Sequence, residues 1–416
     1  MNTCETDMRV FELLDEAVDD AFEAEQLALL KELVDLPSAS REVEDVEMAL
    51  ERLDQAAREC GLVIQKIDPG AHEVASHRIY LMHAATDNKK TLTLLVGHID
   101  TVFPRSMGFF GTKREGDRLM GPGVLDMKSG LTEMLFALEA IRRVDPKRWA
   151  ALPVALVVVS DEEIGSPSSR SIWKEWGPRA WQALVFEAGR PGDQIVTRRK
   201  GSGLFTIRAH GQAAHAGNRI FDGASAIHAI ACAVLGLESM TDPAGNLTVN
   251  VGIIRGGSAK NTVPEHAEIE VDVRFSSSEA LSHFEEGLYR ILRDPCTHIG
   301  DQWVNDRVKK VMLRVDGGVA RPPMESTEKT QSLRLRYEKH ARAVGLGCGE
   351  APLQGGGSDA NLLSALGVPC IDGLGPYGEF FHERKEWCSL SSLCKKTKAL
   401  ARFLWAEGAE GMIGFA

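Results

Sequence analysis

The sequence predicts an α/β protein, in which helices flank a mostly parallel sheet and a smaller α+β domain interrupts the chain. Three observations support this. Continuous apolar runs such as Leu92–Val96 and Val154–Val159 alternate with helical segments, which is typical of strands buried on both faces. Residues 267–275 instead alternate strictly between apolar and polar, as in a sheet with one face in water. The 416 residues also exceed the usual size of one domain.

The first half of the chain predicts helices followed by buried strands. Leu27, Leu30, Leu33 and Val34 share one helical face, and Gly61 is placed to end the next helix. In order, the expected elements are helices near 27–34 and 43–53, strands at 62–67, 79–82 and 92–96, a helix from Ser129 to Ile141, and strands at 154–159 and 184–186.

The pattern changes after about residue 196. The expected elements are a strand at 204–209, a helix at 224–240, strands at 248–254 and 267–275, and a helix at 278–293. Residues 317–323, GGVARPP, predict a loop, and the first pattern resumes from Gln331. We therefore expect a discontinuous catalytic domain, residues 1–196 and 303–416, with residues 197–302 as the inserted domain.

Composition excludes several classes of protein. Forty-eight basic against 59 acidic residues give a net charge of −11, so nucleic acid is not an expected partner. No apolar run is long enough to span a membrane, so no membrane association is expected either. The eight cysteines are scattered without a C-x-x-C pair, and the acidic N-terminus lacks the features of a signal peptide. These features favour reduced thiols and a cytoplasmic location.

Polar residues that could bind a metal follow each of the buried strands. His98 and Asp100 follow the strand at 92–96, and Glu162 and Glu163 follow the strand at 154–159. Ligands of α/β proteins bind beyond the carboxyl ends of strands, so we expect these residues to meet. The remaining candidates are Asp126 in a glycine-rich loop, Glu187 after the strand at 184–186, and His382 after two phenylalanines.

Most of these residues also have an ordinary structural interpretation when taken alone. His98 could be a loop histidine, and Asp100 a turn or helix cap. Asp126 or Ser129 could cap the helix that follows them, and residues 161–163 could form a solvated acidic loop. Two histidines and three carboxylates together suit zinc, and one shared carboxylate can bridge two ions. Glu162, which is not needed as a ligand, could then move the proton of an attacking water.

The motifs GHIDTVFP, GPGVLDMKSG, SDEEIGS, FEAGR and FFHER occur in this order along most of the chain. They resemble those of the di-zinc aminoacylase and carboxypeptidase family, which includes glutamate carboxypeptidase, succinyl-diaminopimelate desuccinylase and acetylornithine deacetylase. The likeness is strongest to glutamate carboxypeptidase. It implies a zinc-binding α/β domain with an inserted dimerisation or lid domain, and a homodimer.

The resemblance also assigns roles to the candidate residues. Asp126 would bridge two divalent ions, most simply Zn²⁺, with Co²⁺ or Mn²⁺ as alternatives. His98 and Glu187 would complete one ion site, and Glu163 and His382 the other. Asp100 would orient His98, and Glu162 would be the general base for a metal-bridging hydroxide. Some relatives have a cis peptide bond after the bridging aspartate, so the bond after Asp126 is a candidate for the same geometry.

The inserted domain carries further family-like segments. His215 resembles a histidine that crosses the dimer interface to stabilise the oxyanion, although it could be an ordinary turn histidine. Arg274 and Asn261 resemble residues that hold a substrate carboxylate, and Arg274 could instead form an ion pair with the acidic residues of its own strand. Lys200, at the domain entrance, and Gly357, in the GGGSD loop, complete the predicted substrate-binding residues.

Together these features predict a hydrolase that cleaves an amide bond next to a free carboxylate. Its substrate would be a small or peptide-like molecule, with a C-terminal glutamate or an N-acyl amino acid as the two favoured forms. A hydrolase that releases an amine from an aromatic or carbamoyl-type small molecule is the alternative. A binding protein without catalysis is disfavoured, because no expected ligand and no expected base is missing from the sequence.

Overall fold

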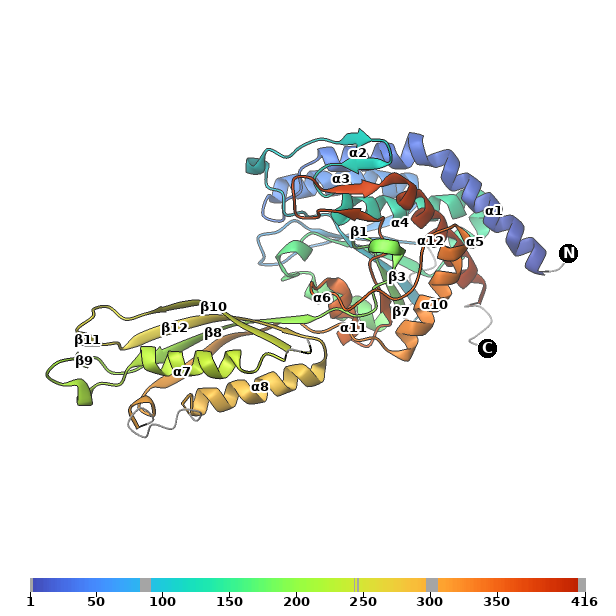
Figure 1. The fold of residues 1–416 in the computed structure, drawn as a ribbon. Coiled ribbons are helices and arrows are strands. Elements are labelled where there is room, and N and C mark those ends of the chain that lie inside the picture. The colour runs from blue at the N-terminus through green and yellow to red at the C-terminus, as the bar shows by residue number, and fades with distance from the viewer. Residues whose placement is uncertain (1–2, 83–90, 243, 245–246, 297–305, 411–416) are drawn as a thin grey trace. The chain divides into compact units, whose positions relative to one another are not determined.

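The structure is a computed structural model that describes residues 3–82, 91–242, 244, 247–296 and 306–410. The chain divides into two compact units (Figure 1). Unit 1 contains Met1–Thr197, Ser326–Pro352 and Ser358–Ala416, and unit 2 contains Arg198–Glu325 and Leu353–Gly357. Each unit is described on its own.

Unit 1 is built on a six-stranded sheet with the strand order β1-β2-β6-β3-β7-β14. The pairings among β6, β3, β7 and β14 are parallel, whereas β1 and β2 add antiparallel pairs, so the sheet is mixed. Every residue of the central strands β3 and β6 is buried, as their continuous apolar sequences predict. The bounds are β1 Val63–Ile67, β2 His77–Leu81, β3 Leu92–His98, β6 Val154–Val159, β7 Ala180–Val185 and β14 Cys370–Ile371.

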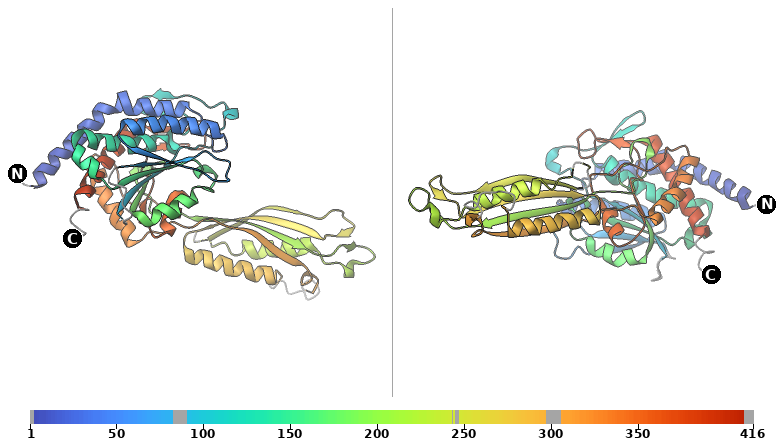
Figure 2. Two further views of the ribbon diagram at one scale, coloured as in Figure 1. Left: turned by 180° about the vertical axis from the view of Figure 1, so that it is seen from behind. Right: turned by 60° about the horizontal axis from the view of Figure 1, so that its bottom comes forward.

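Helices cover both faces of this sheet, with α3 and α4 on one side and α6 and α11 on the other (Figures 1 and 2). The helix α4 is buried along most of its length and packs against α12 and α1. The α/β class predicted from the sequence is therefore confirmed. The helices are α1 Thr3–Ala21, α2 Leu27–Asp35, α3 Val43–Glu59, α4 Ser129–Val144, α5 Pro146–Ala151, α6 Arg170–Trp176, α10 Glu328–Ala343, α11 Asp359–Ala365 and α12 Leu390–Glu410.

A small antiparallel sheet in unit 1 was not expected from the sequence. Its order is β15-β16-β5-β4, with bounds Gly378–Glu379, Trp387–Ser389, Arg118–Met120 and Lys113–Glu115. Trp387 pairs with Met120, so the segment around residue 382 is joined to the chain just before residue 126. Strands of two or three residues carry too little periodicity to be detected in a sequence.

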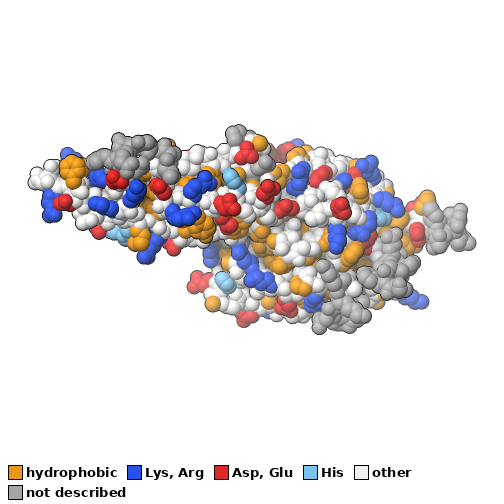
Figure 3. All heavy atoms as spheres, turned by 90° about the horizontal axis from the view of Figure 1, so that it is seen from below, with side chains coloured by type: hydrophobic (Ala, Val, Ile, Leu, Met, Phe, Trp, Pro, Cys, Tyr) orange, Lys and Arg blue, Asp and Glu red, His pale blue; other side chains and the backbone are white. Residues whose placement is uncertain are grey.

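Unit 2 is a four-stranded antiparallel sheet in the order β10-β12-β8-β13, with two helices on one face. In β12, the apolar residues of the predicted alternation are buried in the core of the unit. Charged side chains of both signs are scattered over the helical face, with apolar side chains between them (Figure 3). The bounds are β8 Gly201–His210, α7 Ala226–Glu238, β10 Leu247–Gly256, β12 His266–Phe275, α8 Ser278–Arg293 and β13 Met312–Arg321, with a separate ribbon of β9 Ala214–His215 and β11 Thr262–Val263.

Strand β13 corrects the predicted loop at residues 317–323. It pairs with β8 from Met312 to Arg321. Gly317 has φ +96°, and a Cβ atom there would lie 2.2 Å from the carbonyl oxygen of Leu204 on β8. Gly317 therefore permits close approach of neighbouring strands here, instead of forming a turn.

The second predicted domain border, between residues 302 and 303, lies outside the described residues. The structure divides the units between Glu325 and Ser326, because β13 belongs to the sheet of unit 2. The first border falls between Thr197 and Arg198, one residue after the predicted position.

A disulfide bond joins Cys232 of α7 to Cys296, just after α8. The expectation that the cysteines are reduced is therefore wrong for this pair. The two residues are 64 positions apart, and a spacing of that length carries no information about proximity in the fold. Within the described ranges, none of the helices has the length and apolarity required to cross a bilayer.

Candidate metal centre

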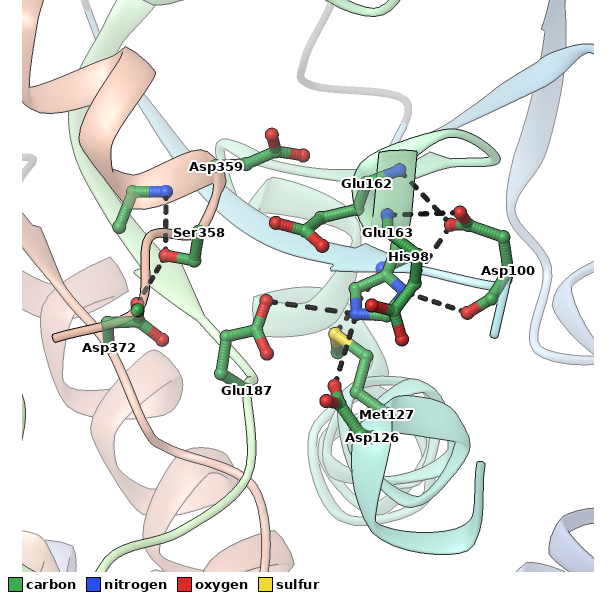
Figure 4. Close-up of polar contacts among 12 residues, drawn as sticks. His98, Asp100, Asp126, Met127, Glu162, Glu163, Glu187, Ser358, Asp359 and Asp372 are labelled. Carbon is green, nitrogen blue, oxygen red and sulfur yellow. Dashed lines mark hydrogen bonds and ion pairs between the residues drawn. The ribbon is translucent and has the colours of Figure 1, made fainter. Parts of the chain in front are cut away.

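The carboxyl ends of three adjacent parallel strands converge on one cluster of polar side chains. His98 is the last residue of β3, Glu163 lies just beyond β6, and Glu187 lies just beyond β7 (Figure 4). Asp126 comes from the segment Val124–Lys128, where its own backbone is not helical, and His382 from the segment between β15 and β16. The structure therefore brings together all five residues that the sequence suggested as metal ligands.

Asp126 lies at the centre of this cluster and presents one carboxylate oxygen to each histidine. Its Oδ1 is 3.3 Å from Nε2 of His98, and its Oδ2 is 3.3 Å from Nε2 of His382. Glu187 Oε1 lies 3.8 Å from the same His98 nitrogen, and Glu163 Oε2 lies 3.2 Å from Nε2 of His382. The five side chains thus form two three-residue groups that share Asp126.

Several of these atoms are buried without hydrogen bonds. Within the described part of the chain, His98 Nε2, Asp126 Oδ1 and Glu163 Oε1 have no hydrogen-bond partner. Buried polar atoms are normally satisfied, and carboxylate and imidazole atoms converging in this way are the donors that zinc and similar divalent ions prefer. The residues present therefore fit a pair of divalent cations.

The electrostatics of the cluster agree with this fit. Burial disfavours the charged form of His98, but its contacts with Asp100 and Asp126 prevail and raise its pKa well above the usual value. Hydrogen bonds with Asp126 and Glu163 raise the pKa of His382 to about 10. Burial and the neighbouring charge of Asp126 raise the pKa of Glu187. The carboxylates thus concentrate negative charge that protons, or cations in their place, must balance.

Asp100 connects two of the loops that build the site. Its backbone oxygen is 2.9 Å from Nδ1 of His98, so the ring is oriented chiefly by a main-chain contact, with the carboxylate 3.4 Å away. The carboxylate itself accepts hydrogen bonds from the backbone N–H groups of Glu162 and Glu163, at 3.2 and 3.1 Å, and from Ser40 Oγ at 2.6 Å. Asp100 therefore holds the loop after β6 as well as the histidine.

Glu162 belongs to neither ligand group. Its side chain is largely buried, and its charge is one of the causes of the raised pKa of Glu187, so the two carboxylates are near neighbours. Figure 4 shows the Glu162 carboxylate pointing to the side of the cluster where Glu187 lies. This places a carboxylate that is not in either group beside the ligands, as a general base requires.

Sequence reasoning missed Glu386. This buried carboxylate accepts hydrogen bonds from the backbone N–H groups of Leu125, at 2.7 Å, and Asp126, at 3.0 Å. Burial, together with the charge of Asp126, raises its pKa to about 8. Its place in the motif HERKE, four residues after His382, was the available signal.

Lys128 was missed as well, and it anchors the same loop from the other side. Its Nζ donates hydrogen bonds to the carbonyl oxygens of Leu33 and Leu36, both at 2.8 Å, and burial lowers its pKa to about 7. The peptide bond between Asp126 and Met127 is cis, as the resemblance suggested. No side-chain hydrogen bond caps the start of α4, so the capping interpretation of Asp126 and Ser129 does not apply.

The other predicted site residues lie in unit 2. His215 pairs with Thr262 in the β9–β11 ribbon, next to Asn261, and His215 Nδ1 accepts hydrogen bonds from the backbone of Gly217 and Asn218. Arg274 binds Asp272 with two hydrogen bonds of 2.9 Å, which is the ion-pair alternative considered above.

Lys200 and Gly357 belong to the part of unit 2 where the chain passes between the units. The backbone N–H of Lys200 donates to the carbonyl oxygen of Gln354, in the segment that also carries Gly357. A role at the metal cluster stays a prediction for Lys200, Gly357, His215, Asn261 and Arg274.

Comparison with known proteins identifies relatives along most of the chain. The model of peptidase family M20/M25/M40 matches residues 94–406. Carboxypeptidase G2 of Pseudomonas sp. (strain RS-16) is 26% identical over 383 residues, covering 91% of this chain and 88% of that protein. A probable carboxypeptidase of Aspergillus terreus is 33% identical over 201 residues, covering 44% and 45% of the two chains.

Solved structures show the same fold. Aminopeptidase PepT of Bacillus cereus superposes with a TM-score of 0.71 at 20% identity, covering 92% of this chain and 98% of that one. The YXEP protein of Bacillus subtilis, described as a dinuclear metal-binding peptidase, superposes with a TM-score of 0.65 at 17% identity, covering 93% and 99%.

Proposed function

This chain belongs to peptidase family M20/M25/M40, and on that basis we propose that it hydrolyses an amide bond adjacent to a free carboxylate, as a glutamate carboxypeptidase or an N-acyl amino acid deacylase. The observation that carries the proposal is the position of Asp126, which faces His98 with one oxygen and His382 with the other. The chain is similar to carboxypeptidase G2 over most of the length of both proteins, which supports a substrate with a free C-terminal carboxylate.

The cofactor we propose is a pair of divalent cations, most simply Zn²⁺. His98, Asp126 and Glu187 would hold one cation, and Asp126, Glu163 and His382 the other. Bound there, the cations would supply Lewis-acid chemistry, polarising the scissile carbonyl and making a water acidic enough to react at neutral pH.

The remaining steps belong to side chains of this protein. Glu162 takes a proton from the attacking water and delivers it to the nitrogen of the leaving amine. Asp100 fixes the backbone of Glu162 and thereby the position of this base. His215 of a second subunit would stabilise the developing oxyanion. Lys200, Asn261 and Gly357 are the proposed contacts to the substrate, together with Arg274 if Asp272 releases its guanidinium.

We propose a homodimer formed through unit 2. Strand β10 is an edge of its sheet, and Ile253 and Ile254 on this strand are exposed. Ile227 and Leu235 on α7, which contacts β10, are exposed as well. Apolar side chains beside an unpaired strand edge are typical of surfaces that a second chain covers.

The test is to assay the zinc-loaded protein against N-acyl amino acids, α- and γ-glutamyl peptides and aryl amides. Dialysis against a chelator should abolish turnover. Glu162→Gln should lower kcat by about 10²–10⁴-fold while both metals remain bound, because only the base is removed. Glu163→Gln is the matched control, in which metal content itself should fall. Normal turnover in Glu162→Gln would exclude the mechanism.

One observation favours the second candidate, release of an amine from an aromatic or carbamoyl-type molecule. The guanidinium of Arg274 already donates two hydrogen bonds to Asp272, so these N–H groups are not available to a substrate carboxylate. Arg274→Ala separates the candidates. A large rise in KM for substrates with a free carboxylate supports the first, and an unchanged KM together with turnover of aryl amides supports the second.

A further inference from the structure

A chain of buried hydrogen bonds lies behind the loop that carries Glu162 and Glu163. It starts at His77, which begins β2 and is almost fully buried. Strand β2 pairs antiparallel with β6, with Arg78 opposite Val158, so His77 lies beside the end of β6 where this loop begins. Neither the sequence motifs nor the proposed mechanism uses His77.

Both ring nitrogens of His77 have buried partners in the segment that follows β6. The backbone N–H of Ser160 donates to Nδ1 at 3.2 Å, and Nε2 lies 2.9 Å from Ser168 Oγ. Ser168 Oγ in turn donates to Asp161 Oδ2 at 2.6 Å. The same carboxylate oxygen accepts hydrogen bonds from the backbone N–H groups of Ser168 and Ser169, at 2.7 and 3.2 Å.

These contacts specify the protonation state of His77. Nδ1 accepts a backbone hydrogen bond, so it carries no proton. Ser168 uses its own proton on Asp161, so Nε2 must be the donor to Ser168. The hydroxyl of Ser160 also lies 3.2 Å from Nδ1, but it donates its proton to the carbonyl oxygen of Ala75 at the shorter distance of 2.6 Å. Burial lowers the pKa of His77 against the opposing charges of Asp161, Asp100 and Asp359, which favours the same neutral form.

The loop after β6 is thus held on two sides. Asp100 binds the backbone N–H groups of Glu162 and Glu163, and the chain from His77 binds the two preceding residues. We propose that His77 is a positioning residue, which works as the neutral Nε2–H tautomer and, through Ser160, Ser168 and Asp161, places Glu162 and Glu163 at the metal cluster. The part of this inference that concerns Glu162 rests on the proposed function.

Three substitutions test the proposal. His77→Phe keeps the ring but removes both hydrogen bonds, whereas His77→Asn retains an acceptor near Nδ1 and His77→Gln a donor near Nε2. We expect His77→Phe to lower kcat at saturating zinc by at least about tenfold with little change in KM, and to weaken zinc binding by about 10–100-fold. His77→Asn and His77→Gln, which each keep one of the two hydrogen bonds, should have kcat values and zinc affinities between those of wild type and His77→Phe.

A role confined to global stability gives a different result. It lowers the melting temperature but leaves kcat and zinc affinity unchanged in protein assayed well below that temperature, and this outcome would overturn the proposal. His72 is an exposed histidine before the same strand, and His72→Phe serves as the matched control. This variant should match wild type in kcat and in zinc affinity.

A long-range ¹⁵N–¹H spectrum of histidine-labelled protein tests the tautomer directly. The expected spectrum shows His77 neutral and protonated on Nε2 at pH 7. An Nδ1–H tautomer or an imidazolium would overturn the proposal. Zinc affinity and the tautomer do not depend on turnover, so they decide the role of His77 even if wild type hydrolyses none of the amides tested.

Discussion

The side chain of Glu386 accepts a hydrogen bond from the backbone N–H of Asp126, 260 positions earlier in the chain, with an N–O distance of 3.0 Å. Glu386 follows His382 by four residues, so one side chain connects the loops that supply two ligands of the same group. The geometry of the bridging aspartate therefore depends on a residue that binds no metal in the proposed site.

The first prediction concerns this connection. Glu386→Ala leaves two buried N–H groups without their acceptor and should weaken zinc binding by about 10–100-fold, as measured by calorimetry. Glu386→Gln keeps a carbonyl oxygen in place and should bind zinc nearly as wild type does. Glu383→Ala removes an exposed carboxylate of the same loop and is the control. Equal affinities in the alanine variant and wild type would contradict the interpretation.

The second prediction concerns pH and metal affinity. With no cation bound, Asp126 and Glu163 raise the pKa of His382 to about 10, so this histidine is protonated at neutral pH. Zinc must displace that proton. Apparent affinity should therefore rise with pH between about 6 and 9, by up to about tenfold per unit for each proton released.

Calorimetry in buffers of different ionisation enthalpy counts the released protons. His382→Ala should release fewer protons than wild type, because one of the displaced protons is gone. An affinity that does not change with pH would show that the histidines are already neutral before metal binds.

The third prediction concerns acid stability. Glu47 on α3 accepts hydrogen bonds from Ser76 N at 2.7 Å and from Arg78 and Lys66, both at 3.1 Å. Burial alone would raise its pKa, but these hydrogen bonds outweigh burial and lower the pKa to about 2, from an ordinary value of 4.5. A lowered pKa stabilises the fold above pH 4.5, and this contribution disappears as pH falls from 4.5 towards 2.

Urea unfolding should therefore show that Glu47→Gln lowers the free energy of unfolding by about 1.5–3 kcal/mol at pH 7. The difference from wild type should shrink below pH 4.5. Glu51→Gln, at an exposed position of the same helix, should be close to neutral throughout. A difference for Glu47→Gln that stays constant down to pH 2 would rule out the ionised carboxylate as its source.

Much of the cluster could be predicted because its proposed ligands follow a simple rule. His98, Glu163 and Glu187 stand at or just beyond the ends of buried strands, and apolar strands are the clearest signal in this sequence. The strand at 267–275 and the helix at 278–293 could be predicted because apolar residues recur at regular intervals in both segments.

What could not be predicted depends on contacts between distant segments. Glu386 and His77 are single polar residues whose partners lie far away in the sequence. The only signal for Glu386 is its position four residues after His382, and no local pattern marks His77. The pairing of Cys232 with Cys296 is of the same kind. Strand β13 could not be predicted because Gly317 and Gly318 resemble a turn, although Gly317 instead allows β13 to approach the backbone of β8 closely.

The sequence of unit 2 interrupts the sequence of unit 1. The proposed ligands are therefore synthesised in two stages. His98, Asp126, Glu163 and Glu187 all leave the ribosome before unit 2 begins at Arg198, whereas His382 emerges only after unit 2 is complete. One group of three ligands is thus available to a nascent chain while the other still lacks a member. Assembly of the pair is consequently a late event, and a chain that stops early retains at most one complete set of ligands.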